Sequence, residues 1–164
     1  MTETQRETVP RNDDDELDTA LSFLRFARGC VFKKASGLSD EQLREVLVPT
    51  GTTILGLVAH LTAGERYWFG WTLAGTGADD DETDFEPDPS GRPTDDVLQE
   101  YRDAITASDA VITRLGDPEA RTARTVDGVP KTMRWVLAHM TSETARHAGH
   151  ADILREQIDG TTGR

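Results

Sequence analysis

The apolar residues of this chain recur every three or four positions in four long stretches, which is the spacing of one face of an α-helix. The pattern predicts helices over residues 13–34, 52–73, 94–115 and 132–158. Each stretch opens near a residue that can cap a helix N-terminus, and a glycine follows soon after its end. Four amphipathic helices of this length predict an all-α fold, an antiparallel four-helix bundle.

Shorter signals lie between these stretches. Ser39-x-x-Gln42 has the spacing of a capping box and predicts a single helical turn, and Asp127-Gly128 predicts a small hairpin or tight turn. Residues 78–93, rich in acidic residues and proline, are expected to form a long irregular connection between the second and third helices, either a crossover or a lid. We expect a disordered N-terminal tail over residues 1–12 and a single domain over residues 13–160.

The last predicted helix carries an unusual set of polar side chains. At about 100° per residue, they fall within an arc of roughly 80° on one helix face. They are His139, Glu143, His147 and His150. Trp135 and Leu154 share that face, so we expect it to point inward. Ionisable side chains are seldom fully buried unless they are paired or bind a metal.

Metal ligation is the chemistry that this pattern favours. Glu143 and His147 stand four residues apart and can reach one ion, and His60, in the second predicted helix, can supply a third ligand. Two nitrogens, one carboxylate and an open position suit Zn²⁺, and Ni²⁺, Fe²⁺ or Mn²⁺ are also compatible. His60, His147 and His150 form a competing ligand set. If His60, Glu143 and His147 are the ligands, His139 and His150 are left over and would be a hydrogen-bonding partner of a ligand or a general base. The ordinary alternative is that the histidines are hydrogen-bonded core residues.

Charge and composition exclude other classes of function. The formal net charge of −12 argues against nucleic acids and anionic membranes as partners, because both are bound through clustered lysine and arginine. A single cysteine, Cys30, excludes an intramolecular disulfide. We find no signal peptide and no apolar run long enough to span a bilayer, and we therefore expect a cytoplasmic protein.

Two segments of the chain carry a recognisable pattern. One holds Leu-Val-Ala-His-Leu at 57–61 and Glu-Arg-Tyr-Trp-Phe at 65–69, and the other holds Arg-His-Ala-Gly-His-Ala-Asp at 146–152. With these motifs the chain resembles the DinB/YfiT-like superfamily of metal-binding four-helix bundles, and within it the mini-circle protein-like branch. The resemblance implies a bundle, often a homodimer, with one divalent metal held by three residues of the second and last helices.

The ligand pattern departs from that of most members, in which three histidines bind the metal and the last two are four residues apart. Here Glu143 stands four residues before His147. The chain is similar in this to the N-terminal domain of mycothiol-dependent maleylpyruvate isomerase, whose ligands are two histidines and a glutamate. Carried over by position, the resemblance implies His60, Glu143 and His147. The isomerase has an additional C-terminal domain that we do not expect here, so its isomerase activity is not implied.

The resemblance also implies a reaction. Relatives resemble S-transferases that use a low-molecular-weight thiol such as mycothiol, which would attack an electrophilic substrate. Trp68 and Trp71 are candidates for the apolar wall of the substrate pocket, and Arg146 for holding a carboxylate. The alternatives are a non-catalytic metal-binding or stress-response protein and a metal-free dimeric interaction module.

Overall fold

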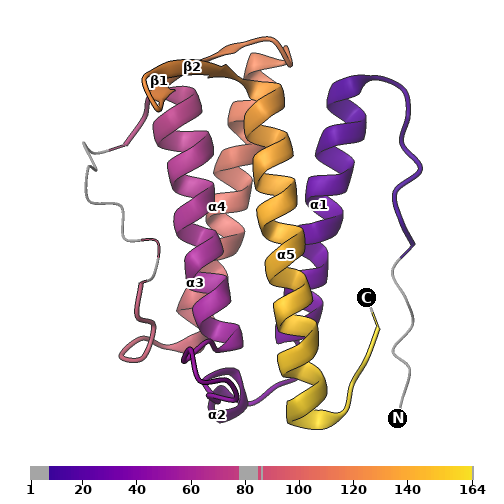
Figure 1. Ribbon diagram of the computed structural model, residues 1–164, viewed down its shortest axis with the longest axis vertical. Coiled ribbons are helices and arrows are strands. Elements are labelled where there is room, and N and C mark those ends of the chain that lie inside the picture. Colours follow the sequence, from indigo (N-terminus) through magenta and orange to yellow (C-terminus); the bar gives the residue numbers. More distant parts are fainter. Residues whose placement is uncertain (1–7, 78–84, 86, 164) are drawn as a thin grey trace.

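The computed structural model describes residues 8–77, 85 and 87–163 and has four long helical rods with a short hairpin across one end (Figure 1). The helices are α1 (Glu16–Ala35), α2 (Asp40–Leu43), α3 (Ile54–Glu65), α4 (Thr94–Leu115) and α5 (Met133–Asp159). A π-helix, η1 (Arg66–Ala74), continues α3, and the strands are β1 (Arg121–Val126) and β2 (Val129–Thr132). The all-α four-helix bundle is thereby confirmed.

The helices do not follow a simple up-and-down order. Arg44, just before α3, donates to the Thr94 hydroxyl at the start of α4, so α3 and α4 begin at the same end of the bundle. They run parallel to each other and antiparallel to α1 and α5 (Figure 1). The connection between η1 and α4 is therefore a crossover, one of its two predicted forms. Its residues 78–84 and 86, and residues 1–7 of the predicted tail, lie outside the described part of the chain.

Local capping explains where the helices begin. The side chain of Asp15 accepts the backbone N–H of Asp18 at the start of α1, and Thr53 accepts that of Gly56 at the start of α3. The predicted capping box is present, because Ser39 and Gln42 each bond the other's backbone N–H. The predicted turn at Asp127-Gly128 closes an antiparallel hairpin that packs on η1.

The second long helix changes its geometry after Glu65. In η1 the hydrogen bonds span five residues, so that the N–H of Gly75 reaches the carbonyl of Gly70. Each turn is wider than an α-helical turn, which rotates the side chains after Glu65 relative to a regular α-helix. The prediction of one continuous α-helix over residues 52–73 was wrong in this respect.

The buried face of α5 is not the face predicted. Its buried side chains are Met133, Val136, Leu137, Met140, Thr144, Ala148, Ala151 and Leu154. The histidines and Glu143 lie beside this face: His139, Glu143 and His147 are half-buried, and His150 is exposed. Trp135 and Ile153 are 37% and 57% exposed. The histidines and Glu143 therefore face the groove between α3 and α5, where solvent can reach them. Of the residues on the predicted inward face, Leu154 alone is buried.

A buried ion-pair network ties three helices together near the middle of the bundle. Arg28 of α1 donates to both carboxylate oxygens of Glu65, at 2.7 and 2.6 Å, and to Asp109 of α4 at 2.8 Å. Buried charges are tolerated when they are paired in this way. Among the described residues, no helix has the length and apolar character needed to cross a membrane.

Candidate metal centre

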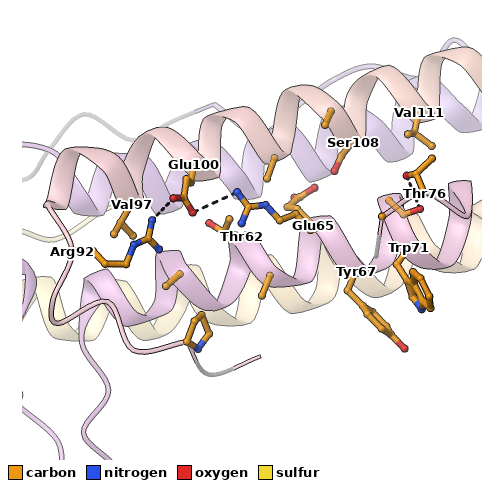
Figure 2. Close-up of a pocket in the computed structure, with 18 residues that line it drawn as sticks. Thr62, Glu65, Tyr67, Trp71, Thr76, Arg92, Val97, Glu100, Ser108 and Val111 are labelled. Atoms are coloured by element: carbon orange, nitrogen blue, oxygen red, sulfur yellow. Dashed lines mark hydrogen bonds and ion pairs between the residues drawn. The ribbon is translucent and has the colours of Figure 1, made fainter. Parts of the chain in front are cut away.

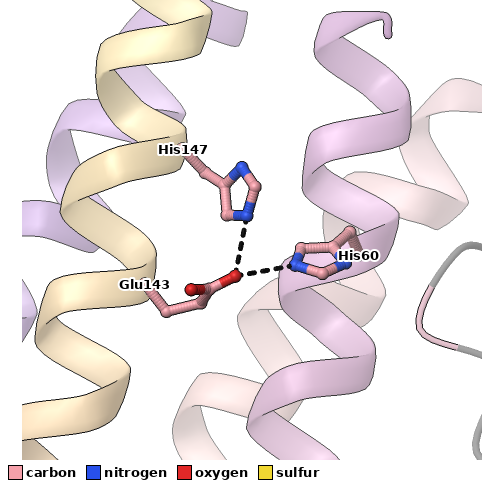
Figure 3. A group of neighbouring side chains, drawn as sticks. All are labelled: His60, Glu143 and His147. Carbon is pink, nitrogen blue, oxygen red and sulfur yellow. Dashed lines mark hydrogen bonds and ion pairs between the residues drawn. The ribbon is translucent and has the colours of Figure 1, made fainter. Parts of the chain in front are cut away.

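Three predicted ligands converge in the groove between α3 and α5 (Figure 3). Nε2 of His147 lies 2.9 Å from Oε1 of Glu143, and Nε2 of His60 lies 3.3 Å from the same oxygen. One ligand atom from each residue lies within 4.8 Å of the other two. Within the described part of the chain, this is the one group of three such side chains that could hold a metal ion. Two helices distant in the chain thus bring these three side chains together, and their role as metal ligands stays a prediction.

In His60 and His147, the ring nitrogen that does not face Glu143 has a contact of its own. Nδ1 of His60 lies 2.5 Å from the carbonyl oxygen of Phe85, and Nδ1 of His147 lies 3.2 Å from Nδ1 of His150. Such contacts orient metal-binding imidazoles in proteins. His150 is exposed and directs Nδ1 at His147 rather than at His60 or Glu143. The geometry therefore favours Glu143 over His150 as the third ligand.

The two contacts of His60 are in conflict in a neutral imidazole, which carries only one N–H. If Nδ1–H donates to the Phe85 carbonyl, the lone pair of Nε2 faces the carboxylate of Glu143. Two acceptors then face each other. A cation between these atoms removes the conflict, as does a second proton on the ring. The donor set, with two imidazole nitrogens and one carboxylate, fits a divalent transition metal or Zn²⁺.

Charge around Glu143 keeps it ionised. Burial opposes ionisation, but hydrogen bonds from Arg146, His147 and His60 outweigh it and lower the pKa of Glu143 to about 2. Burial lowers the pKa of His147, against the opposing effect of Glu143. An ionised carboxylate and a neutral imidazole are the forms that bind metals. At neutral pH these two groups therefore carry the net charges that metal ligands need, and His147 has only to move its proton from Nε2 to Nδ1.

Two pockets adjoin this triad and share His60. One has a volume of about 460 Å³ and a mixed lining, more polar than that of the other pocket, whose polar members include Arg44, Thr50, Thr52, Asp88, Ser90 and His150. We call it the polar pocket. The other, of about 200 Å³, is lined by His60, Leu61, Gly64, Trp68, Phe85, His139, Met140 and Glu143. Because His60 lines both, a ligand in either pocket reaches the triad.

His139 belongs to an aromatic cluster instead of the ligand group. Its ring centroid lies 4.4 Å from that of Trp68, and Trp135 stacks on its outer face at 5.1 Å. Burial lowers the pKa of His139, against an opposing effect of Glu143. This histidine is therefore predominantly neutral at pH 7, and it forms a wall of the smaller pocket.

The sequence of residues 19–160 matches the family model of the mycothiol S-transferases. The chain belongs to the mycothiol S-transferase family. This family is DinB/YfiT-like, so the resemblance stated from the sequence is confirmed, while the mini-circle protein-like branch stays a prediction. No curated protein matches the chain.

In this member of the mycothiol S-transferase family, two predicted substrate residues lie apart from the pockets at the triad. Trp71 lines a third pocket, of about 530 Å³, between α3, η1 and α4 (Figure 2), and the Arg124 guanidinium lies 3.2 Å from its ring centre. Arg146 is 62% exposed and forms an ion pair with Oε2 of Glu143. Its position supports a role in orienting the carboxylate, and a direct contact with substrate stays a prediction.

Two residues near the triad carry no signal in the sequence, Phe85 and Arg44. Phe85 contacts both His60 and Tyr67, although it stands in the acidic connection, where no periodic pattern marks it. Arg44 lines the polar pocket and holds residues 89–94 through four hydrogen bonds. Neither could be found from spacing, because both reach the site through irregular backbone.

Proposed function

We propose that this protein is a divalent-metal-dependent S-transferase that joins mycothiol to a small electrophile. Family membership supports the thiol and the reaction class, and the convergence of His60, Glu143 and His147 is the observation that supports the metal. Zn²⁺ is the proposed ion, with Ni²⁺, Fe²⁺ and Mn²⁺ as alternatives. A homodimer and a cytoplasmic location remain predictions.

His60, Glu143 and His147 would hold the ion, and their side chains are only 21%, 19% and 15% exposed. When bound beside a thiol, a divalent ion lowers the thiol pKa and stabilises the thiolate near neutral pH. Phe85 and His150 fix the two imidazole rings, and Arg146 holds the second oxygen of Glu143. The protein thus supplies a prearranged ligand set, which limits the reorganisation needed on binding.

The transfer itself exchanges one bond for another. The sulfur of mycothiol forms a bond to an electrophilic carbon, and the bond from that carbon to its leaving group breaks with both electrons going to the leaving group. The proton of the thiol must go to a base. His150 lines the polar pocket and is exposed to solvent, so we assign it the role of accepting this proton and passing it to water. His139, in the smaller pocket, is the alternative base.

A non-catalytic metal-binding protein is the competing function, in which the ion only ties α3 to α5. The two pockets on either side of the triad favour catalysis, because a purely structural metal site is closed to other ligands.

Metal content and conjugation, measured together, test the proposal. We expect about one metal ion per chain in protein loaded with Zn²⁺, and mycothiol conjugation of monobromobimane with loss of bromide. Both should be lost in His60→Ala and Glu143→Ala and kept in the control Glu156→Ala, which changes an exposed glutamate of the same helix. Metal binding without conjugation of any electrophile would support the non-catalytic function. Full activity in Glu143→Ala would overturn the proposed ligand set.

A further inference from the structure

The two pockets at the triad lie in one groove and differ in the polarity of their linings. Residues that precede His60 on α3, and residues that follow Glu143 on α5, line the polar pocket. Residues that follow His60 and precede Glu143 line the smaller one. Since α3 and α5 are antiparallel, the pockets lie at opposite sides of the triad along the groove.

The larger pocket has the more polar lining of the two, with hydroxyl groups and charges set among apolar residues such as Val46 and Leu57. Thr50 and Thr52 bond each other at 2.9 Å, and Asp88 bonds both the N–H and the hydroxyl of Ser90. Arg44 secures this wall by donating to the carbonyl of Pro89 at 2.8 Å. Such a lining offers donors and acceptors in many directions, which suits a ligand rich in hydroxyl groups. Its volume of about 460 Å³ is within the usual range for a pocket that binds a small molecule.

The smaller pocket is aromatic and apolar. Trp68 packs on His139 from one side, and Tyr67 links Trp68 to Phe85 through edge-on contacts with ring centroids 5.0 Å apart. Met140 adds a flexible thioether beside these rings. A volume of about 200 Å³ has room for about one aromatic ring, judging from an engineered apolar cavity of roughly 150 Å³ that holds benzene.

We propose that the two pockets divide the two substrates between them: the polar pocket binds the hydrophilic thiol, and the aromatic pocket binds a small, flat, apolar electrophile. This inference rests on the proposed function and adds the substrate class and the specificity-determining residues, Trp68 and Thr52. Because both pockets share His60, the sulfur of one ligand and the reactive carbon of the other meet beside the triad.

Direct binding tests the assignment without relying on activity. The chain has three tryptophans, so protein labelled with ¹⁵N-tryptophan gives three indole N–H signals in NMR, which Trp→Phe variants assign. The probes are mycothiol and 1,3-dinitrobenzene, a flat ring without a leaving group. We expect dinitrobenzene to shift the signals of Trp68 and Trp135 and to leave that of Trp71 unchanged. Mycothiol should bind without displacing it.

Two variants separate the pockets. Trp68→Leu should weaken dinitrobenzene at least tenfold and leave the dissociation constant of mycothiol within twofold. Thr52→Val should weaken mycothiol at least fivefold and leave dinitrobenzene unchanged. The matched controls are Phe23→Leu on α1 and Thr106→Val on α4, both exposed side chains outside these pockets, and they should change neither constant. Circular dichroism of each variant checks that the fold is retained.

Three results would overturn the inference: competition between the two probes, a shift of Trp71 alone, or a loss of mycothiol binding in Trp68→Leu. The expected binding pattern with no conjugation by the zinc-loaded protein would support the pocket assignment and reject the proposed transferase function. Conjugation of both 1-chloro-2,4-dinitrobenzene and iodoacetamide, with the same rate ratio in wild type and Trp68→Leu, would leave the function standing and overturn the aromatic pocket.

Discussion

Nε2 of His60 lies 3.3 Å from Oε1 of Glu143, although 83 residues separate the two in the chain. The contact joins α3 to α5 and places an imidazole nitrogen and a carboxylate oxygen where one ion can bind both. The same carboxylate oxygen contacts His147, one turn further along α5. Glu143 therefore lies at the centre of the three side chains.

Replacing Glu143 by glutamine should weaken zinc binding by at least about 100-fold, since changing even a group that only orients a ligand costs 10- to 100-fold. Glu143→His should bind zinc within about tenfold of wild type, because the resemblance implies a histidine at this position in most DinB-like relatives. Competition with a chromophoric chelator measures both affinities. Equal zinc affinity in wild type and Glu143→Gln would show that the carboxylate is not a ligand.

Zinc affinity should fall as the pH is lowered from about 7 towards 5, because protons compete with the ion for the imidazoles. The decline should be shallow near pH 7, since burial lowers the pKa of His147 and leaves its ring neutral there. Isothermal titration calorimetry at several pH values gives the slope and the number of protons released. An affinity that rises on acidification would contradict ligation by histidine.

In the metal-free protein, Glu143 should stabilise the fold at neutral pH and lose this effect in acid. Its pKa is lowered from 4.5 to about 2, so above pH 4.5 the folded and unfolded chains are equally deprotonated at this site. As the pH falls from about 4.5 towards 2, residue 143 is protonated first in the unfolded chain, which stabilises the unfolded state relative to the folded one. The difference in free energy of unfolding between wild type and Glu143→Gln should therefore shrink between about pH 5 and pH 2, as followed by urea denaturation.

The buried network supplies a prediction independent of the metal. Glu65→Ala leaves the guanidinium of Arg28 buried with only Asp109 to pair it, and should destabilise the fold by about 3–5 kcal/mol. Glu100→Ala, which breaks partly exposed pairs with Arg66 and Arg92, should cost at most about 1 kcal/mol per pair. Urea denaturation of the two variants compares them. A similar, small loss in both would show that the network contributes little.

The double variant Arg28→Met with Glu65→Leu removes both charges and should recover most of the stability lost in Glu65→Ala. Failure of this rescue in a folded protein would mean that shape, rather than charge pairing, determines packing at this point of the core.

Helical periodicity by itself determined most of the secondary structure. The spacing of apolar residues located four long helices, and short-range chemistry indicated where capping residues lie, because a cap depends on residues three positions apart. The structure shows these caps to be Asp15, Thr53 and Thr132, whereas α4 begins after Pro93 without a side-chain cap. Glu143 and His147 could be paired for the same reason, since residues four apart on a helix are neighbours. His60 could be assigned to the same site because it is the one histidine outside the last helix and lies in an apolar helical stretch, where ionisable side chains are rare.

Tertiary packing decided what periodicity could not. The parallel course of α3 and α4 depends on a crossover whose path carries no periodic signal. The π-helix η1, which packs on the hairpin and α4, is likewise not marked by the spacing of apolar residues. A helical pattern shows which residues share a face but not how far that face is buried. It therefore could not show that Trp135 is exposed while Trp68 lines the smaller pocket. The arrival of Phe85 and Arg44 at the site, and the separation of Trp71 from it, likewise depend on contacts between segments distant in the chain.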